Sequence, residues 1–344
     1  MISDDIGKTE ERLHMLSYIQ LTTTDPAFNL AAEEYVFESL PQDRSYLMLW
    51  QNDHAVIIGK YQNTLAEINL PYAEQHHIRV VRRLSGGGAV YHDLGNLNYT
   101  FITDAEGSET LNMRLFCEPV VRVLKKLGVN AEINGRNDLT VDGKKFSGNA
   151  QYLRHGRIMH HGTILFNSDL SVMSNVLRVN EEKITAKGIR SVRSRVTNLL
   201  PCFPSAITLE DFRQALLDDL LSAQPGDPYA FSERDLAEIA ALRDSRYNRW
   251  EWNFGRSPSC TVIKNAYTEG CGFVEARISL DKGLITGITF CGDFFSMTDP
   301  EELAPLFIGQ KPDSEGFRTA LAGIDVSSYF FGLTGEKLLE ILCS

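Results

Sequence analysis

One helical segment and several short apolar runs make up the first hundred residues. Asp25 is placed to cap a helix, and Pro26 follows at a position that needs no N–H donor, so a helix is predicted over residues 26–39. Turn residues such as Asn52 separate five strand-like runs, at residues 46–50, 55–58, 78–84, 89–91 and 97–102. So many short strands predict a β-sheet.

The middle of the chain mixes helical and strand patterns. Residues 119–127 have a helical pattern that Gly128 closes, and residues 139–141 form a strand that enters a hairpin turn at Asp142-Gly143. The partner strand is expected over residues 145–151, followed by another strand at residues 157–166. Residues 178–195 carry many cations and little periodicity, so we expect a loop.

Two helices and a change of pattern mark the second half. Capping signatures begin at Thr208 and Ser232, and residues 225–228 predict a turn between the two helices. Beyond Gly255 the pattern becomes three strand-like runs, residues 261–267, 272–279 and 284–290, followed by helical segments. We therefore expect three parts: an N-terminal extension (1–15), a large domain (16–255) and a small α+β domain (256–344).

Composition narrows the class of protein. The 344 residues are 43% hydrophobic and 23% charged, as in an ordinary globular protein, and no apolar run approaches the roughly 18 residues of a membrane helix. The net charge is 34 minus 45, or -11, which argues against binding to nucleic acid or to an anionic membrane. Six cysteines without a CxxC pair indicate free thiols in the cytoplasm.

Three successive glycines are the most informative feature. Gly86, Gly87 and Gly88 lie between two strand-like runs and directly after Arg82-Arg83-Leu84-Ser85. Glycines allow close approach of the main chain to a ligand, and successive N–H groups can form a nest for an anion such as a phosphate. A flexible bulge is the competing interpretation. The segment is not a dinucleotide fingerprint, because Tyr91 stands where a glycine is required.

A second group of candidates lies at residues 134–150. Alternation along a strand puts Lys145, Ser147 and Asn149 on one side, with Phe146 and Gly148 on the other. Lys145 is therefore the candidate catalytic cation, facing a cleft, whereas Lys144 is expected to be a solvated turn residue. For Asp138, an ion pair with a nearby arginine is a strong alternative to a role in catalysis.

The two adjacent histidines, His160 and His161, point to opposite faces of a strand. They therefore cannot share one metal ion, and one of them is expected to be a core or pocket histidine. The cations at residues 183–195, taken alone, fit a solvated loop.

Together these segments resemble the lipoate-protein ligase family. Its marks are Arg-Arg-x-Ser-Gly-Gly-Gly-Ala-Val-Tyr/Phe-His-Asp, Gly-Arg-Asn-Asp-Leu and Lys-x-Ser-Gly-x-Ala, which occur in order at residues 82–93, 135–139 and 145–150. The similarity continues through residues 160–162, 187–199 and 250–255. Residues beyond 255 carry no comparable motif, but they have the length and pattern of the family's accessory domain.

The resemblance implies a fold and an activity. The fold is α/β (α+β): a large biotin/lipoate ligase-type domain with a mixed sheet and flanking helices, followed by a small domain. The activity joins lipoate and ATP, with Mg²⁺, into lipoyl-adenylate. The lipoyl group then passes to a lysine on lipoyl domains of 2-oxoacid dehydrogenase complexes or on the glycine-cleavage H protein. We expect a monomer whose small domain changes its orientation on adenylation.

The resemblance also assigns residues. Contacts to ATP or lipoyl-adenylate are expected from Arg83, Gly86, Gly87, Gly88, Ala89, Val90, Tyr91, Asn137, Lys145, Lys187 and Arg193, and contacts to lipoate from Arg83, Gly87, Lys145, Gly148 and His161. Attack on a phosphorus atom by a carboxylate requires cations and N–H donors, which agrees with these assignments. Lys145 and Asp138 are the catalytic candidates. Asp138 is left with three roles: binding Mg²⁺, orienting Lys145, or accepting a proton. Residues 183–195 are expected to cover the site.

Two other functions compete. An ATP-independent lipoyl or octanoyl transferase of the same superfamily works through a cysteine thioester, but no cysteine lies between Cys117 and Cys202. A lipoate or carrier-protein binder without catalysis is the other alternative, and the presence of Arg83, Gly88 and Lys145 argues against it.

Overall fold

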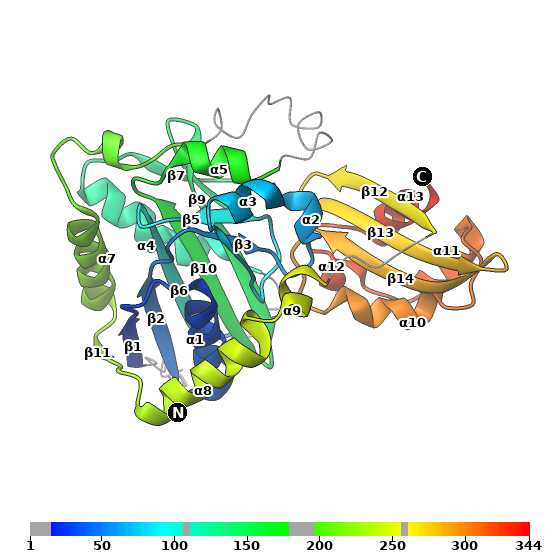
Figure 1. The fold of residues 1–344 in the computed structure, drawn as a ribbon, viewed down its shortest axis with the longest axis horizontal. Coiled ribbons are helices and arrows are strands. Elements are labelled where there is room, and N and C mark those ends of the chain that lie inside the picture. Colours follow the sequence, from blue (N-terminus) through cyan, green and yellow to red (C-terminus); the bar gives the residue numbers. More distant parts are fainter. Residues whose placement is uncertain (1–14, 106–110, 136, 179–195, 256–260) are drawn as a thin grey trace, which may run out of the picture.

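Three β-sheets organise the part of the chain that the structure describes (Figure 1). The computed structural model describes residues 15–105, 111–135, 137–178, 196–255 and 261–344. An eight-stranded sheet and a small three-stranded sheet are built from residues before 229, and a second three-stranded sheet lies in the C-terminal part. No helix among these residues is long and apolar enough to cross a membrane.

The eight-stranded sheet is mixed. Its order is β11-β1-β2-β6-β10-β9-β8-β7; β11, β1 and β2 run parallel, and the remaining neighbours are antiparallel. The strands are β1 (Met15–Gln20), β2 (Arg44–Trp50), β6 (Asn96–Asp104), β7 (Ala131–Asn134), β8 (Asp138–Val141), β9 (Lys144–Arg154), β10 (Arg157–Leu165) and β11 (Gly226–Pro228). The mixed sheet confirms the expected fold class.

Both faces of this sheet are covered, which explains the continuous apolar run of β2. Leu47 and Leu49 pack into one core cluster with α4 (Met113–Lys126) and α7 (Leu209–Ala223). Met48 and Trp50 point the other way, into a cluster with α1 (Pro26–Ser39). Successive strand residues face opposite sides, so a strand between two cores needs apolar residues at every position.

A small sheet of order β4-β3-β5 lies over the α1 side of the large one. It contains β3 (Ala55–Ile58), β4 (Arg79–Arg82) and β5 (Val90–His92), and β4 and β5 flank β3. The chain must therefore pass across the end of β3 between β4 and β5, and residues 83–89, which we call the glycine turn, make that passage. Short helices α2 (Thr64–Glu67), α3 (Leu70–Gln75) and α5 (Leu170–Val176) accompany this sheet.

The predicted helix caps are present. Asp25 accepts hydrogen bonds from the first turn of α1, and complete capping boxes start α7 at Thr208 and α8 (Glu233–Leu242) at Ser232. The helix predicted at 119–127 was wrong at its start, because α4 begins at Met113 and contains Pro119. Met113, Cys117 and other buried residues of α4 pack on the core, and this burial outweighs one lost backbone hydrogen bond.

Three strands were not predicted or were misassigned. β1 and β7 were not predicted, and the turn predicted at residues 225–228 contains β11, which pairs with β1. β11 lies at the edge of the sheet, where Pro228 costs no ladder hydrogen bond.

The C-terminal part has the predicted order of three strands and then helices. β12 (Val262–Thr268), β13 (Gly272–Asp281) and β14 (Leu284–Gly292) form an antiparallel sheet, which follows α9 (Trp250–Phe254) in the chain. Four helices pack around one core: α10 (Ala304–Phe307), α11 (Ser314–Leu321), α12 (Val326–Tyr329) and α13 (Gly335–Cys343). This sheet lies beside the large sheet in Figure 1.

Candidate active site

A pocket lies between the two sheets of the N-terminal part, and we call it the slot. One row of paired residues crosses its floor, with Trp50 on β2 opposite Asn98 on β6 and Asn98 opposite Thr163 on β10. Gly148 on β9 continues the row, because its N–H donates to the Thr163 hydroxyl at 3.3 Å. Strands lie about 4.8 Å apart, so the slot spans about 14 Å from Trp50 to Gly148.

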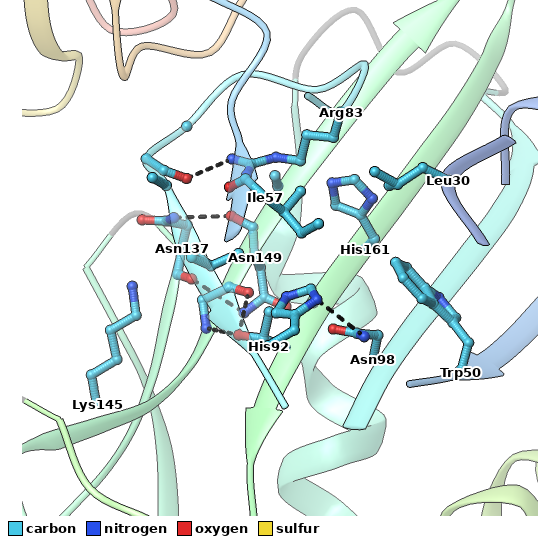
Figure 2. A pocket seen from close by; sticks show the side chains of 18 residues that line it. Leu30, Trp50, Ile57, Arg83, His92, Asn98, Asn137, Lys145, Asn149 and His161 are labelled. Atoms are coloured by element: carbon cyan, nitrogen blue, oxygen red, sulfur yellow. Dashed lines mark hydrogen bonds between the residues drawn. The ribbon is translucent and has the colours of Figure 1, made fainter. Parts of the chain in front are cut away.

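The two ends of the slot differ in polarity (Figure 2). Lys145 and Asn137 lie at one end, which we call the mouth, and Trp50 and Leu30 lie at the other, which we call the closed end. The Lys145 side chain is 34% exposed, whereas Trp50 and Leu30 are buried. An elongated molecule with an anionic group and an apolar body therefore matches the slot.

The glycine turn forms part of the roof, and Arg83 holds its shape. The Arg83 guanidinium is buried; Nη2 donates to the carbonyl oxygens of Gly86 (2.6 Å) and Gly88 (2.9 Å), and Nε donates to Ser85 Oγ (3.0 Å). Burial lowers the pKa of Arg83 to about 10, so it stays cationic at neutral pH. Arg83 thus organises the turn and lines the slot with its side chain.

Backbone donors of the turn remain available. Gly88 and Ala89 line the slot, and their amide groups have no hydrogen-bond partner within the described residues. Gly87 has φ +90°, a conformation that favours glycine, and its N–H donates to the carbonyl oxygen of Phe294 at 3.2 Å. The turn therefore leaves two successive backbone N–H donors free among the described residues, as the predicted anion nest requires.

Lys145 and Asp138 form the ionic feature of the mouth. Lys145 Nζ lies 2.6 Å from Asp138 Oδ1, and both side chains are about one-third exposed (34% and 31%). An arginine was the expected ion-pair partner of Asp138, and the partner is Lys145 instead. An exposed pair of this kind positions the ammonium group more than it stabilises the fold.

A bulge in β9 changes the predicted alternation. Thr140 pairs with Lys145 but Leu139 pairs with Ser147, so Phe146 is an extra residue in the ladder. Lys145 and Gly148 consequently share a side, and a Cβ at Gly148 would lie 2.9 Å from Lys145 Nζ. The prediction that they face opposite ways was wrong. Gly148 leaves the room that the Lys145 side chain needs.

Asn137 ties β8 to β9 beside Lys145. Its Nδ2 donates to the Asn149 carbonyl at 2.9 Å, and its own carbonyl accepts from the Asn149 backbone N–H at 2.9 Å. Asn137 lines the slot as expected. These bonds fix the backbone next to Gly148 and so the wall of the mouth.

The two histidines do face opposite sides. His161 lines the slot: its Nδ1 donates to Glu33 Oε1 at 2.9 Å, and its Nε2 accepts from the Ser85 hydroxyl at 2.6 Å. His160 lies on the other face, where Nδ1 is 3.1 Å from Gln151 Nε2. Burial lowers the pKa of His160 well below its ordinary value, so His160 is a neutral core residue.

A buried network connects the closed end to the glycine turn. Trp50 Nε1 donates to Thr100 Oγ1 (3.0 Å), and Thr100 donates to Glu33 Oε1 (2.7 Å), the same oxygen that accepts from His161. His161 then leads through Ser85 to Arg83. One chain of side chains thus fixes both the wall and the roof of the slot.

The C-terminal part contacts the roof directly. Besides the bond from Gly87 to Phe294, Lys60 Nζ lies 2.8 Å from Asp299 Oδ2, and the Tyr61 and Ser296 hydroxyl groups lie 2.6 Å apart. A Cβ at Gly86 would lie 2.3 Å from the Phe294 carbonyl oxygen, so Gly86 permits this approach.

Comparison with known sequences identifies the family. Residues 25–221 match the lipoyl protein ligase A/B catalytic domain, and residues 257–342 match the bacterial lipoate protein ligase C-terminus. The chain belongs to the lipoate-protein ligase family. It is 41% identical to lipoate-protein ligase LplJ of Bacillus subtilis over 92% of this chain and 97% of that protein, and 40% identical to lipoate–protein ligase 1 of Staphylococcus aureus over 93% and 97%.

Solved structures agree on the fold. LipL1 of P. falciparum, in complex with lipoate, has a TM-score of 0.77 at 20% identity, over 94% of this chain and 97% of that one. Lipoate-protein ligase A bound with ATP has a TM-score of 0.58 at 28% identity over 70% and 98%. A bipartite lipoate protein ligase of Thermoplasma acidophilum, studied with its E2 lipoyl domain, has 0.62 at 30% over 72% and 100%. The chain is therefore an enzyme, a lipoate-protein ligase.

Most residues that the resemblance assigned line the slot of this ligase: Arg83, Gly87, Gly88, Ala89, Val90, Asn137, Lys145, Gly148 and His161. Gly86 and Tyr91 do not. Tyr91 alternates with Val90 and His92 on β5, so its ring lies in the apolar cluster beneath α3 and α5. Asp138 reaches the slot through Lys145. Lys187 and Arg193, with the expected cover at 183–195, lie outside the described residues.

The closed end of the slot was not predicted from the sequence. Leu30, Trp50, Ile57, His92 and Asn98 line it, and Glu33 and Thr100 support it. These residues come from α1, β2, β3, β5 and β6. Most of them carry no local sequence signal that would distinguish a pocket residue from an ordinary core residue. His92 lay inside a family motif, which was the available signal for it.

Proposed function

We propose that this ligase forms lipoyl-adenylate from lipoate and ATP in the slot and then lipoylates a lysine of a carrier domain. The observation that carries the proposal is that the Lys145 ammonium group and the amides of Gly88 and Ala89, unpaired among the described residues, line one cavity. In the first step a lipoate carboxylate oxygen bonds to the α-phosphorus while the bond to pyrophosphate breaks. Charge gathers on the phosphoryl oxygens, and an ammonium group with fixed N–H donors stabilises it.

The proposed orientation of lipoate follows from the polarity of the slot. The carboxylate lies at Lys145, and the apolar arm runs along the floor toward Trp50, past Gly148 and Thr163. Small residues at the mouth end of the row leave room for the arm. Apolar walls at the closed end gain free energy by excluding water from the ring, about 25 cal/mol per Å² of apolar surface.

The second step needs positioning and exclusion of water. The lysine nitrogen bonds to the acyl carbon, the acyl–oxygen bond breaks, AMP leaves, and the amine loses a proton. We propose as carriers the lipoyl domains of 2-oxoacid dehydrogenase complexes and the glycine-cleavage H protein. Residues 183–195, with Lys187 and Arg193, remain the proposed cover.

Mg²⁺ in nucleotide sites takes one or two carboxylates and completes its shell with phosphate oxygens and water. No group of three His, Cys, Asp or Glu side chains in the described part of the chain could hold an ion by itself. Asp138, next to Lys145, fits the role of a single carboxylate that joins the phosphates. The Mg²⁺ ion would neutralise negative charge on the phosphate groups.

We further propose that residues 16–255 form the catalytic domain and that 256–344 move when the adenylate forms. The Gly87 N–H already donates to the Phe294 carbonyl, so a phosphate gains this donor only when that contact opens. The described cysteines are free thiols, which supports a cytoplasmic location, and we propose a monomer.

The test combines an assay with a matched pair of variants. Pure protein is incubated with ATP, Mg²⁺, lipoate and an apo lipoyl domain, and the domain is weighed by mass spectrometry. Lys145→Ala is expected to lower lipoate-dependent pyrophosphate exchange at least about a thousandfold, because it removes the cation of the mouth. Lys144→Ala, at the exposed first residue of β9 and not on the turn as predicted, is expected to change exchange less than about twofold.

Lipoylation that proceeds equally well without ATP would contradict this proposal and support direct acyl transfer instead. Pyrophosphate exchange near the wild-type rate in Lys145→Ala would show that Lys145 is not the catalytic cation. Equal melting temperatures of the two variants and the wild type are the control for folding.

A further inference from the structure

Arg82 is a buried cation that the proposed chemistry does not use, although it opens the family motif that contains the glycine turn. Its side chain is 1% exposed and does not line the slot. The side chain of neighbouring Arg83 does line the slot, as expected for successive residues that point to opposite sides. A role for Arg82 in the reaction therefore has to pass through the groups that it binds.

One side of the Arg82 guanidinium holds the loop that follows β3. Nη1 donates to the carbonyl oxygens of Gly59 (2.8 Å), Lys60 (3.0 Å) and Gln62 (2.7 Å). These oxygens converge on one nitrogen because residues 59–62 form a tight turn, in which the Gln62 N–H donates to the Gly59 carbonyl at 3.1 Å. We call residues 59–62 the support loop.

The other side of the guanidinium holds α9, which precedes the C-terminal part in the chain. Nε donates to the Trp252 carbonyl oxygen (2.9 Å), and Nη2 donates to the Asn253 carbonyl oxygen (3.2 Å) and the Thr64 hydroxyl (2.7 Å). The Arg82 backbone is bound as well, because its N–H donates to Asn253 Oδ1 and its carbonyl accepts from Trp252 Nε1, both at 2.9 Å. Arg82 is thus fixed by α9, and it fixes the support loop in turn.

The support loop contacts the first half of the glycine turn. The Lys60 N–H donates to the Ser85 carbonyl oxygen at 2.8 Å, which continues the pairing of β3 and β4 beyond the ends of both strands. Gly59 lies so close to the turn that a Cβ there would be 1.9 Å from the Gly87 carbonyl oxygen. A shift of the support loop therefore moves Ser85 and Gly87, and the amide groups of the next two residues, which line the slot, move with them.

We infer that Arg82 is a positioning residue for adenylation, which acts through the support loop on the backbone donors of the glycine turn. Under the proposed function these donors bind phosphate oxygens of ATP, so this inference rests on that function. A planar guanidinium with five N–H donors reaches the support loop and α9 at once, whereas an ammonium group offers three donors from a single atom. Arg82→Lys therefore keeps the positive charge but cannot hold both segments in place.

The floor of the slot belongs to a different sheet. Its row of paired residues lies on β2, β6, β10 and β9 of the large sheet, whereas Arg82 and the support loop extend from strands of the small sheet. Loosening the support loop should therefore weaken the site for the nucleotide more than the site for the arm of lipoate. A role in folding alone would affect both sites alike.

Arg157 supplies a matched control. It is equally buried, and its guanidinium donates to backbone carbonyl oxygens at the C-terminal end of α1, among them those of Phe37 (2.5 Å) and Leu40 (3.2 Å). It does not line the slot. Arg82→Lys and Arg157→Lys therefore lose the same kind of buried contact, one behind the glycine turn and the other at the end of α1.

The experiment measures lipoate-dependent pyrophosphate exchange and, by calorimetry, lipoate binding. For Arg82→Lys we expect kcat/KM for ATP to fall about hundredfold, because small misplacements of binding groups have effects of that size, while the Kd for lipoate changes less than about twofold. For Arg157→Lys we expect both quantities to stay within about twofold of wild type. Melting curves establish that the variants are compared in the folded state.

A second pair of variants reaches the glycine turn without removing Arg82, and it decides the question if Arg82→Lys does not fold. Gly59→Ala pushes a Cβ against the Gly87 carbonyl oxygen, so it should produce the same split between ATP and lipoate. Gly226→Ala is its control, because a Cβ there would lie 2.6 Å from the Leu16 carbonyl oxygen at the edge of the large sheet.

Equal values of kcat/KM for ATP in Arg82→Lys and Arg157→Lys would overturn the inference. An equal loss of ATP and lipoate binding in Arg82→Lys, or wild-type kinetics in Gly59→Ala, would overturn it as well. In each of these cases, wild type that exchanges pyrophosphate in the presence of lipoate leaves the proposed function in place. Wild type without such exchange would contradict the proposed function together with this inference.

Discussion

The mouth and the closed end of the slot are built on opposite principles. At the mouth, Lys145 and Asp138 are about one-third exposed and hold each other through a single ion pair. At the closed end, Trp50, Thr100 and Glu33 are buried and joined in a continuous hydrogen-bonded network. The proposed function accounts for this difference, because groups that rearrange around reacting phosphates would be weakly held, whereas groups that shape a pocket for a fixed ligand would be strongly held. Substitutions at the mouth should therefore lower activity, whereas substitutions at the closed end should lower the stability of the fold.

Breaking the ion pair at the mouth is expected to have a larger effect than any change at the closed end. Asp138→Asn removes the anion that holds Lys145 Nζ at 2.6 Å, so lipoate-dependent pyrophosphate exchange should fall roughly hundredfold. The melting temperature should hardly change, because an exposed pair contributes at most about 1 kcal/mol. Asp142→Asn, on the exposed turn of the same hairpin, is the matched control.

The same variant separates the three roles of Asp138. Loss of exchange with an unchanged Mg²⁺ requirement indicates that Asp138 orients Lys145, and a raised Mg²⁺ requirement indicates a metal ligand. Slow transfer from preformed lipoyl-adenylate, with normal exchange, indicates a proton acceptor. Exchange and transfer both at wild-type rates would contradict the assignment of Asp138 to the site.

Cutting the network at the closed end should lower stability instead. Thr100→Val keeps the shape of the side chain but leaves Trp50 Nε1–H and one Glu33 contact without a partner. The free energy of unfolding, from urea denaturation, should fall by about 1–3 kcal/mol. Thr103→Val on the same strand, where the hydroxyl contacts Ser45 at a partly exposed site, should cost less. Equal losses in the two variants would mean that the network is no more than ordinary packing.

Acid should lower the stability of the fold through two buried histidines, His92 and His160. Burial lowers the folded-state pKa of His92 to about 3 and that of His160 well below 6.5, so the unfolded chain binds more protons as pH falls below 6.5. Each histidine should reduce the free energy of unfolding by about 1.4 kcal/mol per pH unit in that range. Denaturation at pH 7, 6 and 5 should show a smaller slope for His92→Asn than for wild type.

His155→Asn, on an exposed hairpin turn, is the control for that measurement. A slope that is the same in all three proteins would show that the His92 ring already takes up a proton in the folded state.

Local chemistry explains why much of the fold was predictable. Asp25, Thr208 and Ser232 cap helices through their own side chains, and the Asp142-Gly143 turn has positive φ at both residues. These signals act over three or four residues. β11 was assigned to a turn because its strand character comes from pairing with β1, some two hundred residues earlier. Pro119 was taken as a helix start because the burial of α4 is not visible locally.

The site, too, was predictable where local motifs determine it and not where long-range strand pairing does. Family motifs pointed to Arg83, Gly87, Gly88, Lys145 and Gly148, all of which line the slot. Strand alternation then placed Lys145 and Gly148 on opposite sides, and a single extra residue at Phe146 reversed that result. A bulge depends on register with the neighbouring strand, so alternation along one strand cannot reveal it.

Short contiguous motifs were enough to predict the family, the mixed α/β architecture, and several of the cations and glycines that line the slot. Long-range packing was needed to establish which side chains close the slot. Leu30, Trp50, His92 and Asn98 come from four separate elements, and only the stacking of two sheets brings them together. Pairing and packing depend on residues far apart in the chain, so no local pattern in the sequence associates His92 with Asn52 and Asn98, whose amides lie within 3.5 Å of its ring.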